Sequence, residues 1–191
     1  YHFDRCLYIV GAAQALHFRQ LFAALKTMGH KWAERMVHVD FGWVKFGASV
    51  MSTRQGNIVF LDDVLTEAVG NVRALIREKN PELENADQVA EAVGVGAVVF
   101  WQLSVKRQKD VNFDWEEVLS FDGRTGPYLQ YTHARLCSLL ARWGQPLRLQ
   151  DADLSALNTD DERRLLLQLA DWPRRIRQAA EQYEPQVVAS A

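Results

Sequence analysis

The chain has 191 residues, of which 48% are hydrophobic and six are tryptophan, and its formal net charge is -2. This composition excludes a disordered chain and allows either one large core or two small ones. The charge balance argues against an overall basic nucleic-acid binder. Any nucleic-acid contact therefore has to come from a local patch of charge.

The cysteines, the histidines and the hydropathy pattern argue against a disulfide-rich, a metal-binding or a membrane-spanning protein. Cys6 and Cys137 are far apart and lack a C-x-x-C partner, so they indicate neither a disulfide framework nor a zinc site, and they suit a reducing cytoplasm. The five histidines are scattered, without metal-ligand spacing. No apolar run has membrane-spanning length, and the first residues lack the organisation of a signal peptide.

The first fifty residues predict half of a doubly wound sheet. Residues 7–11 are apolar up to a glycine, which is typical of a strand buried on both faces. Apolar side chains then recur at helical spacing from Leu16 to Met28, and Gly29 ends that helix. Residues 36–41 alternate like a second strand. The three elements together predict a right-handed parallel β-α-β crossover.

The loop after the second strand is the most informative stretch. It reads Val50-Met51-Ser52-Thr53-Arg54-Gln55-Gly56-Asn57, between a β-like run at residues 44–46 and an apolar run at residues 58–61. A glycine, hydroxyl side chains and one arginine suit a loop that closes on a phosphate. The alternative is an ordinary solvated hairpin loop. Ligands of parallel sheets gather at the carboxyl ends of the strands, so we expect this loop and residues 11–14 on one rim.

From Asp62 the pattern is helical to the end of the chain. An apolar stripe over residues 64–76 predicts the first helix, which Asn80-Pro81 ends. Asp87 is predicted to cap a second helix that reaches Trp101. Its small residues, which would let a neighbouring helix pack close, are Gly94, Gly96 and Ala97. The two glycines lack the third glycine of a dinucleotide fingerprint and lie inside a helical pattern, so we reject that motif.

Later helix starts carry recognisable caps. These are Asp114, and Thr159 in a capping box with Glu162. Thr125-Gly126-Pro127 opens another helix, with the proline near its first position. Pro173 is predicted to break or kink the helix that follows, ahead of a last helix through Ala180.

Two features suit contact with RNA. Lys106-Arg107-Gln108-Lys109 is a dense basic run, for which phosphate contact and a solvated helix end are the two interpretations. Tyr128, Tyr131 and Arg135 share one helical stripe. Aromatic rings beside an arginine can stack on bases or sugars, or pack the helix against its neighbour, and we favour packing for Tyr128.

Two of these motifs resemble one family. Residues 51–57 resemble the Lys-Met-Ser-Lys-Ser loop of class I aminoacyl-tRNA synthetases, in the form found in arginyl-tRNA synthetases. Phe121-Asp122-Gly123-Arg124-Thr125-Gly126-Pro127-Tyr128-Leu129-Gln130-Tyr131-Thr132-His133-Ala134-Arg135 resembles that family's most recognisable segment. Residues 17–20, 59–65 and 112–115 also fit, in the family's order, so the resemblance covers nearly the whole chain.

The resemblance implies an α/β fold followed by an all-α part. Residues 1–60 would be a partial Rossmann-like parallel sheet, the second half of the class I catalytic fold. Residues 61–123 would be a helical stem-contact region, and residues 124–191 the start of a DALR-type anticodon-binding bundle. Both ends are expected to be cut. Tyr1 is no initiator methionine, and the family's anticodon domain would continue past the last residue.

The resemblance also implies a function. The parent protein would activate L-arginine with ATP, accompanied by Mg²⁺, and transfer the arginyl group to tRNA(Arg), as a cytoplasmic monomer without membrane contact or a protein-bound metal. The catalytic residues would be Ser52, Thr53 and Arg54. The ATP-binding loop would comprise Met51, Ser52, Arg54, Gln55 and Gly56. Gln14 and His17 would line the arginine pocket. The tRNA-binding residues would be Lys106, Arg107, Lys109, Tyr131 and Arg135.

The chain departs from the family pattern in its cations. Val50, Thr53 and Gln55 stand where basic residues occur in the motif or the family, which leaves Arg54 as the loop's only cation. The family is thought to compensate with a lysine elsewhere. The chain also lacks the His-x-Gly-His motif. An alternative function therefore stays open, namely a non-catalytic RNA-binding or interaction module derived from the family. An alternative also stays open for the predicted arginine pocket, in which Gln14 meets only solvent and His17 caps its own turn.

Overall fold

The computed structural model describes residues 2–47, 59–146, 148, 150 and 152–191. The predicted phosphate loop, residues 50–57, lies outside the described residues.

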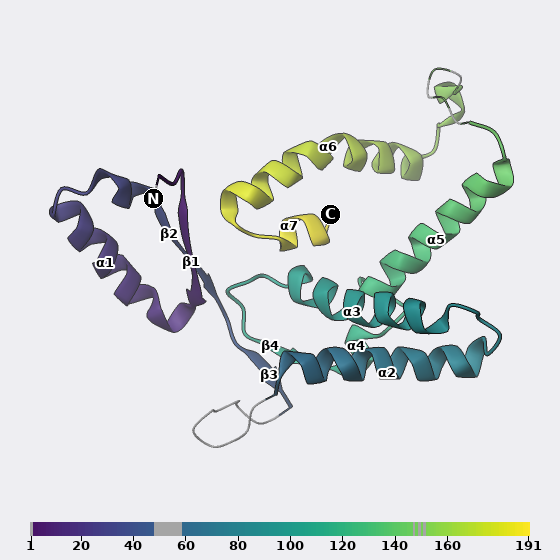
Figure 1. Cartoon of the computed structure of the whole chain (residues 1–191). Coiled ribbons are helices and arrows are strands. Elements are labelled where there is room, and N and C mark those ends of the chain that lie inside the picture. Colours follow the sequence, from purple (N-terminus) through teal and green to yellow (C-terminus); the bar gives the residue numbers. More distant parts are fainter. Residues whose placement is uncertain (1, 48–58, 147, 149, 151) are drawn as a thin grey trace.

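The N-terminal part is the β-α-β unit that the sequence predicts. Strand β1 (Cys6–Gly11) is followed by the 3-10 turn η1 (Ala12–Gln14), helix α1 (Ala15–Thr27), the 3-10 turn η2 (Lys31–Arg35) and strand β2 (Met36–Phe41). The two strands pair in parallel, from Cys6 with Met36 to Gly11 with Phe41. Figure 1 shows α1 lying along one side of the two strands. The parallel crossover is confirmed.

The prediction that β1 is buried on both faces is wrong. On the face towards α1, the ring of Phe18 lies 5.1 Å from that of Tyr8 and stacks on that of His38 at 4.4 Å. On the other face, Ile9 is 69% exposed and Phe41 is 45% exposed. A two-stranded sheet with one covering helix can bury only one of its faces. The described residues place no second layer on the apolar side of these strands.

A second strand pair departs from the predicted all-helical pattern. Strand β3 (Val44–Phe46) pairs in parallel with strand β4 (Val111–Phe113). Phe113 is 7% exposed, and its ring lies 4.8 Å from that of Phe46 and 5.0 Å from that of Trp101. The prediction of helix throughout after Asp62 is therefore wrong at β4. A strand of three residues carries too little periodicity to show in the sequence.

Helices α2 (Leu61–Lys79) and α3 (Ala86–Ser104) run side by side (Figure 1). A Cβ added at Gly94 would lie 2.8 Å from the backbone nitrogen of Val69, so only glycine permits this approach, as the sequence predicts. Asp87 does not cap α3, contrary to the prediction. The residue before the helix is Asn85, and Asp87 lies in the first turn, where it pairs with Arg73 at 2.6 Å.

The main buried cluster lies between these helices and the β3–β4 pair. Its members are Val64, Ala68, Ala97, Val98, Trp101, Phe113 and Val118. The small strand pair is thus anchored by the helical region that follows it.

The remaining helices are α4 (Trp115–Val118), α5 (Gly126–Trp143), α6 (Asp160–Gln182) and α7 (Gln186–Ala189), with the 3-10 turn η5 (Leu154–Ala156) between α5 and α6. The predicted caps at Asp114 and Thr159 and the predicted helix start at Thr125 are confirmed. Asp114 accepts from the backbone N–H of Glu116 at 2.8 Å, Thr125 accepts from Tyr128 at 3.2 Å, and Thr159 forms its capping box with Glu162.

Pro173 does not break the helix, contrary to one of the two predicted outcomes. It lies inside α6, which Figure 1 shows as one continuous, bowed ribbon. Proline removes one backbone hydrogen bond. Asp171 pairs across the proline with Arg174 at 2.5 Å and with Arg175 at 3.1 Å.

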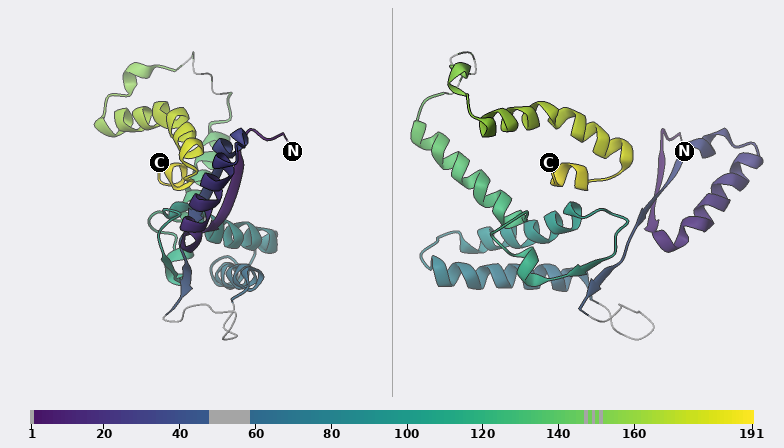
Figure 2. Two further views of the ribbon diagram at one scale, coloured as in Figure 1. Left: turned by 90° about the vertical axis from the view of Figure 1, so that its left-hand side faces the viewer. Right: turned by 180° about the vertical axis from the view of Figure 1, so that it is seen from behind.

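Helices α5 and α6 spread apart from the connection that joins them (Figures 1 and 2). Both helices carry exposed apolar side chains. On α5 the exposed ones are Leu129, Leu136, Leu139, Leu140 and Trp143, and on α6 they are Leu165, Leu166, Leu167, Leu169, Trp172 and Ile176. The far end of α6 turns back towards the β-α-β unit, and α7 contacts α3.

Candidate functional site

The carboxyl ends of β1 and β2 form the rim on which the sequence places the arginine pocket. Gln14 ends η1 directly after β1, is exposed, and makes no capping hydrogen bond to α1. His17 lies one turn further on, also exposed, with its ring edge-on to Phe18 at 5.3 Å. Both side chains are open to a ligand. Their role in binding arginine stays a prediction.

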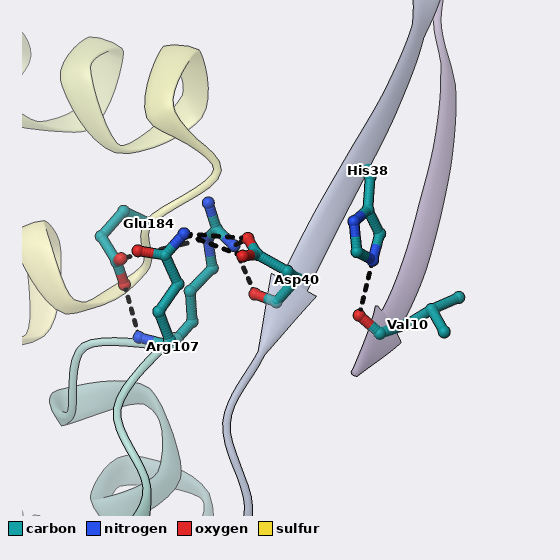
Figure 3. A network of polar contacts seen from close by, with 6 residues as sticks. Val10, His38, Asp40, Arg107 and Glu184 are labelled. Atoms are coloured by element: carbon teal, nitrogen blue, oxygen red, sulfur yellow. Dashed lines mark hydrogen bonds and ion pairs between the residues drawn. The ribbon is translucent and has the colours of Figure 1, made fainter. Parts of the chain in front are cut away.

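Asp40 lies on the same rim, at the end of β2, and is heavily hydrogen-bonded. Arg107 Nη1 donates both to its carboxylate and to its backbone carbonyl (Figure 3). Gln108 Nε2 donates to both carboxylate oxygens at 3.0 Å. Burial alone would raise the pKa of Asp40, but the hydrogen bonds from Arg107 and Gln108 outweigh it and lower that pKa below its usual value. Asp40 is therefore held as a carboxylate.

A second carboxylate approaches Arg107 from the other end of the chain. Glu184, at the corner between α6 and α7, is only 9% exposed. Its Oε1 accepts from the backbone N–H of Arg107 at 3.2 Å, and its Oε2 lies 4.0 Å from Arg107 Nε. Figure 3 shows the guanidinium between the two carboxylates. Arg107 is thus held inside the protein by Asp40 and Glu184.

The rest of the basic run behaves differently from Arg107. The run lies in a turn after α3, closed by a hydrogen bond from the Lys109 N–H to the Lys106 carbonyl at 2.9 Å. Lys106 and Lys109 are exposed, while Arg107 is half-buried. The sequence groups these three cations as one RNA contact. The structure offers only the two lysines to an external phosphate.

The same turn is clamped to the start of β3. The Gly42 N–H donates to the Arg107 carbonyl at 2.8 Å, and a Cβ at Gly42 would meet the Lys109 carbonyl at 2.5 Å. Asp110 accepts from the Trp43 N–H at 2.9 Å and pairs with Lys45 at 3.0 Å. The Trp43 hydrogen bond and then that of Lys45 lower the pKa of Asp110. The chain leaving β2 is therefore fixed to the turn after α3.

Tyr131 and Arg135 lie together on α5, as their spacing predicts. Both are exposed, and the guanidinium lies 5.7 Å from the centre of the ring. Tyr128 is 46% exposed, so its ring is only partly covered. The assignment of Tyr131 and Arg135 to tRNA binding stays a prediction.

The predicted catalytic and ATP-binding residues lie outside the described part of the chain. They are Met51, Ser52, Thr53, Arg54, Gln55 and Gly56. Their assignment therefore rests on the sequence motif alone.

Sequence reasoning missed the two carboxylates and the corner that supports one of them. Tyr183 precedes Glu184 with φ 53°, the left-handed region, and its hydroxyl accepts from Arg5 at 2.7 Å. Asp40 could have been suspected from its place at the end of β2. Glu184 carries no comparable signal, because its partner lies far away along the chain.

Within the described residues, no helix is long and apolar enough to cross a membrane. The same residues contain no group of three or more His, Cys, Asp or Glu side chains arranged to hold a metal ion.

Comparisons with known proteins match both parts of the chain. Residues 1–115 match the family of class I (R) tRNA synthetase catalytic domains, and residues 129–191 match the DALR anticodon-binding domain. The chain is 48% identical over 188 residues to the arginine–tRNA ligase of Clostridium beijerinckii and 45% identical to that of Clostridioides difficile. Each match covers 98% of this chain and 33% of the relative, so the chain spans about a third of the length of these relatives.

Solved structures agree with this assignment. The arginyl-tRNA synthetase of Thermus thermophilus matches 98% of this chain with a TM-score of 0.84 and 34% identity, over 31% of its own length. That of Plasmodium falciparum matches 98% of this chain with a TM-score of 0.78, over 32% of its length; at 21% identity it supports the fold alone. Because the catalytic-domain family matches more than half of the residues of this chain, the chain belongs to the class I arginyl-tRNA synthetase family.

Proposed function

We propose that this chain works as part of an arginine–tRNA ligase. The ligase activates L-arginine with ATP to give arginyl-adenylate and pyrophosphate, and then transfers the arginyl group to tRNA(Arg). The observation that carries the proposal is the pairing, in one chain, of a match to the catalytic family and a match to an anticodon-binding domain. This chemistry needs no covalent enzyme intermediate, so the protein contributes positioning and charge stabilisation.

In this proposal the rim at the ends of β1 and β2 receives arginine. Gln14 supports that role, because its exposed amide oxygen can accept a hydrogen bond from a guanidinium. His17 stands beside it on α1. ATP, accompanied by Mg²⁺, is assigned to the loop of residues 51–56, where Ser52 and Thr53 donate hydrogen bonds and Arg54 stabilises phosphate charge.

The tRNA is assigned to two surfaces. Lys106 and Lys109 are exposed cations in the turn after α3, which suits phosphate contact. Tyr131 and Arg135 form an exposed aromatic–cation pair on α5, which suits a base or a sugar. Arg107, the remaining member of the predicted RNA contact, is engaged by Asp40 and Glu184, so the tRNA is not assigned to it.

We further propose that the ligase acts as a cytoplasmic monomer and that residues 1–60, 61–123 and 124–191 serve as catalytic, stem-contact and anticodon-binding parts. The free thiols of Cys6 and Cys137 support a reducing compartment.

The test is arginine-dependent exchange of pyrophosphate into ATP, followed by charging of tRNA(Arg), by the full-length protein that carries this sequence. Arginine should stimulate both reactions, and lysine and citrulline should not. The 191-residue chain alone, purified free of host synthetase, should show no exchange. A full-length protein that binds tRNA but never activates arginine would instead support a non-catalytic RNA-binding module.

A further inference from the structure

We propose that Arg107 is a positioning residue that joins the rim of the catalytic part to the α6–α7 corner of the anticodon-binding part, so that the two move as one unit. The inference rests on the proposed function. Its two carboxylates, Asp40 and Glu184, are singled out neither by the sequence motifs nor by the family matches. Arg107 belongs to the segment matched as catalytic, and Glu184 to the segment matched as anticodon-binding.

On the catalytic side, Asp40 accepts hydrogen bonds from both Arg107 and Gln108. Arg107 Nη1 donates to both the carboxylate and the backbone carbonyl of Asp40, and Gln108 donates to the same carboxylate. The Asp40 side chain is 20% exposed and that of Arg107 is 22% exposed, so solvent competes weakly for these bonds. Any displacement of Arg107 must therefore move the end of β2.

On the anticodon-binding side, Arg107 contacts Glu184 through its backbone N–H and its Nε. The Arg107 N–H donates to Glu184, whose side chain is 11% exposed, while the Arg107 Nε lies 4.0 Å from that carboxylate, too far for a hydrogen bond. This buried Nε has no hydrogen-bond partner. The hydrogen bonds of the guanidinium thus go to Asp40, whereas Glu184 is joined by a hydrogen bond from the Arg107 backbone and by a longer ion pair to Nε.

The corner itself is held in an unusual conformation. Tyr183 adopts a left-handed backbone conformation, which is unfavourable for a residue other than glycine. Its ring and hydroxyl engage Arg5, just before β1, with the hydroxyl accepting at 2.7 Å and the guanidinium 5.9 Å from the ring centre. Of these two neighbouring corner residues, Tyr183 therefore contacts Arg5 in the N-terminal part, and Glu184 contacts Arg107 in the turn after α3.

Arg107 also bonds the connection between β2 and β3. The Arg107 carbonyl accepts from the Gly42 N–H at 2.8 Å, so one residue bonds the α6–α7 corner through its N–H and the β2–β3 connection through its carbonyl. A half-buried pair of carboxylates on one guanidinium adds little net stability compared with apolar packing. Its directional bonds do fix the relative positions of the groups they join, which is the function we assign to it.

The kinetic test compares Glu184→Ala, Glu184→Gln and the control Asp87→Asn in the full-length ligase. Asp87 pairs with Arg73 between α2 and α3, so its variant also loses an ion pair, but away from the junction. With Glu184→Ala we expect kcat for tRNA charging, per titrated active site, to fall about tenfold, because small misplacements reduce rates strongly. The KM for tRNA should stay within twofold. Glu184→Gln, whose amide oxygen can still accept from the Arg107 N–H, should recover most of the rate, and Asp87→Asn should match the parent.

A second measurement needs no activity. Hydrogen exchange at the Gly42 amide should become faster in Glu184→Ala than in Asp87→Asn, because Gly42 donates to Arg107. Unchanged exchange at Gly42, or a rise in the KM for tRNA with an unchanged kcat, would overturn the inference. If the parent protein lacks arginine-dependent activity, the proposed function fails, and the exchange measurement alone decides whether the corner and the rim are coupled.

Discussion

The guanidinium of Arg135 lies over the ring of Tyr131 at 5.7 Å, and its Nη1 donates to the Tyr131 hydroxyl at 3.3 Å. The two side chains are one helical turn apart on α5, and both face water. An exposed ring already in contact with a cation is preorganised for a base or a sugar.

Replacing that ring should weaken RNA binding. Stacking on an aromatic side chain typically contributes about 1–3 kcal/mol per base, so Tyr131→Ala should raise the dissociation constant for tRNA(Arg) about tenfold or more. Tyr131→Phe keeps the ring and serves as the matched control. Equal affinities for the two variants, measured by filter binding, would remove Tyr131 from the RNA surface.

Charge reversal in the turn after α3 should act through salt dependence. Lys106→Glu with Lys109→Glu should weaken tRNA binding and reduce the slope of log affinity against log salt by about one per lysine, because fewer counterions are released. Lys26→Glu with Lys79→Glu makes the same charge change on α1 and α2 and is the control. If both double variants lose affinity alike, net charge rather than a local contact is responsible.

Gly94 and Gly70 offer a matched pair of glycine substitutions in neighbouring helices. A Cβ at Gly94 would meet the backbone of Val69 at 2.8 Å, whereas a Cβ at Gly70 meets nothing within 4 Å. Gly94→Ala should lower the free energy of unfolding by about 1–3 kcal/mol, because the α2 and α3 backbones must separate. Gly70→Ala should raise it by up to about 1 kcal/mol through helix propensity. Urea titration distinguishes the two, and a stabilising Gly94→Ala would contradict the close helix approach.

Asp171 predicts a pH dependence of stability. The hydrogen bond from Arg174, followed by that from Arg175, lowers the pKa of Asp171 to about 2. Because the folded pKa lies below the unfolded one, the stabilisation is present above the unfolded value of about 4 and is lost as the pH falls towards 2. The difference in Tm between the parent and Asp171→Asn should therefore shrink between pH 5 and pH 2. When both proteins also carry Arg174→Gln, most of this pH dependence of the Tm difference should disappear. If the pH dependence persists, groups other than the Asp171–Arg174 pair cause it.

The last prediction concerns the phosphate loop of the full-length ligase. A charged hydrogen bond contributes about 1.5–3 kcal/mol, or roughly one to two decades in rate if it forms mainly in the transition state. Arg54→Ala should therefore lower kcat for arginine activation more than it raises the KM for arginine. Gln55→Lys should hold or raise that rate. If kcat for arginine activation in Arg54→Ala stays within twofold of the parent value, the cations that stabilise the phosphates must come from other residues.

Most helix caps and the β-α-β crossover could be predicted from the sequence, whereas pairings between segments further apart in the chain could not. The caps at Asp114 and Thr159 depend on bonds two or three residues away, so a short motif specifies them. The pairing of β3 with β4 and the burial of Glu184 against Arg107 join segments far apart in the chain. The basic run illustrates the limit, since three adjacent cations look alike in sequence. Only tertiary contacts separate Arg107 from its lysine neighbours.

The uncovered leucines of α5 and α6 have a practical consequence for anyone who handles this protein. Apolar area in water drives association, and sulfate or phosphate strengthens that tendency by exclusion from the protein surface. At high concentration the chain should scatter light more in ammonium sulfate than in chloride of equal ionic strength. We therefore expect these two helices, more than the net charge of -2, to determine the buffers in which the chain stays dispersed.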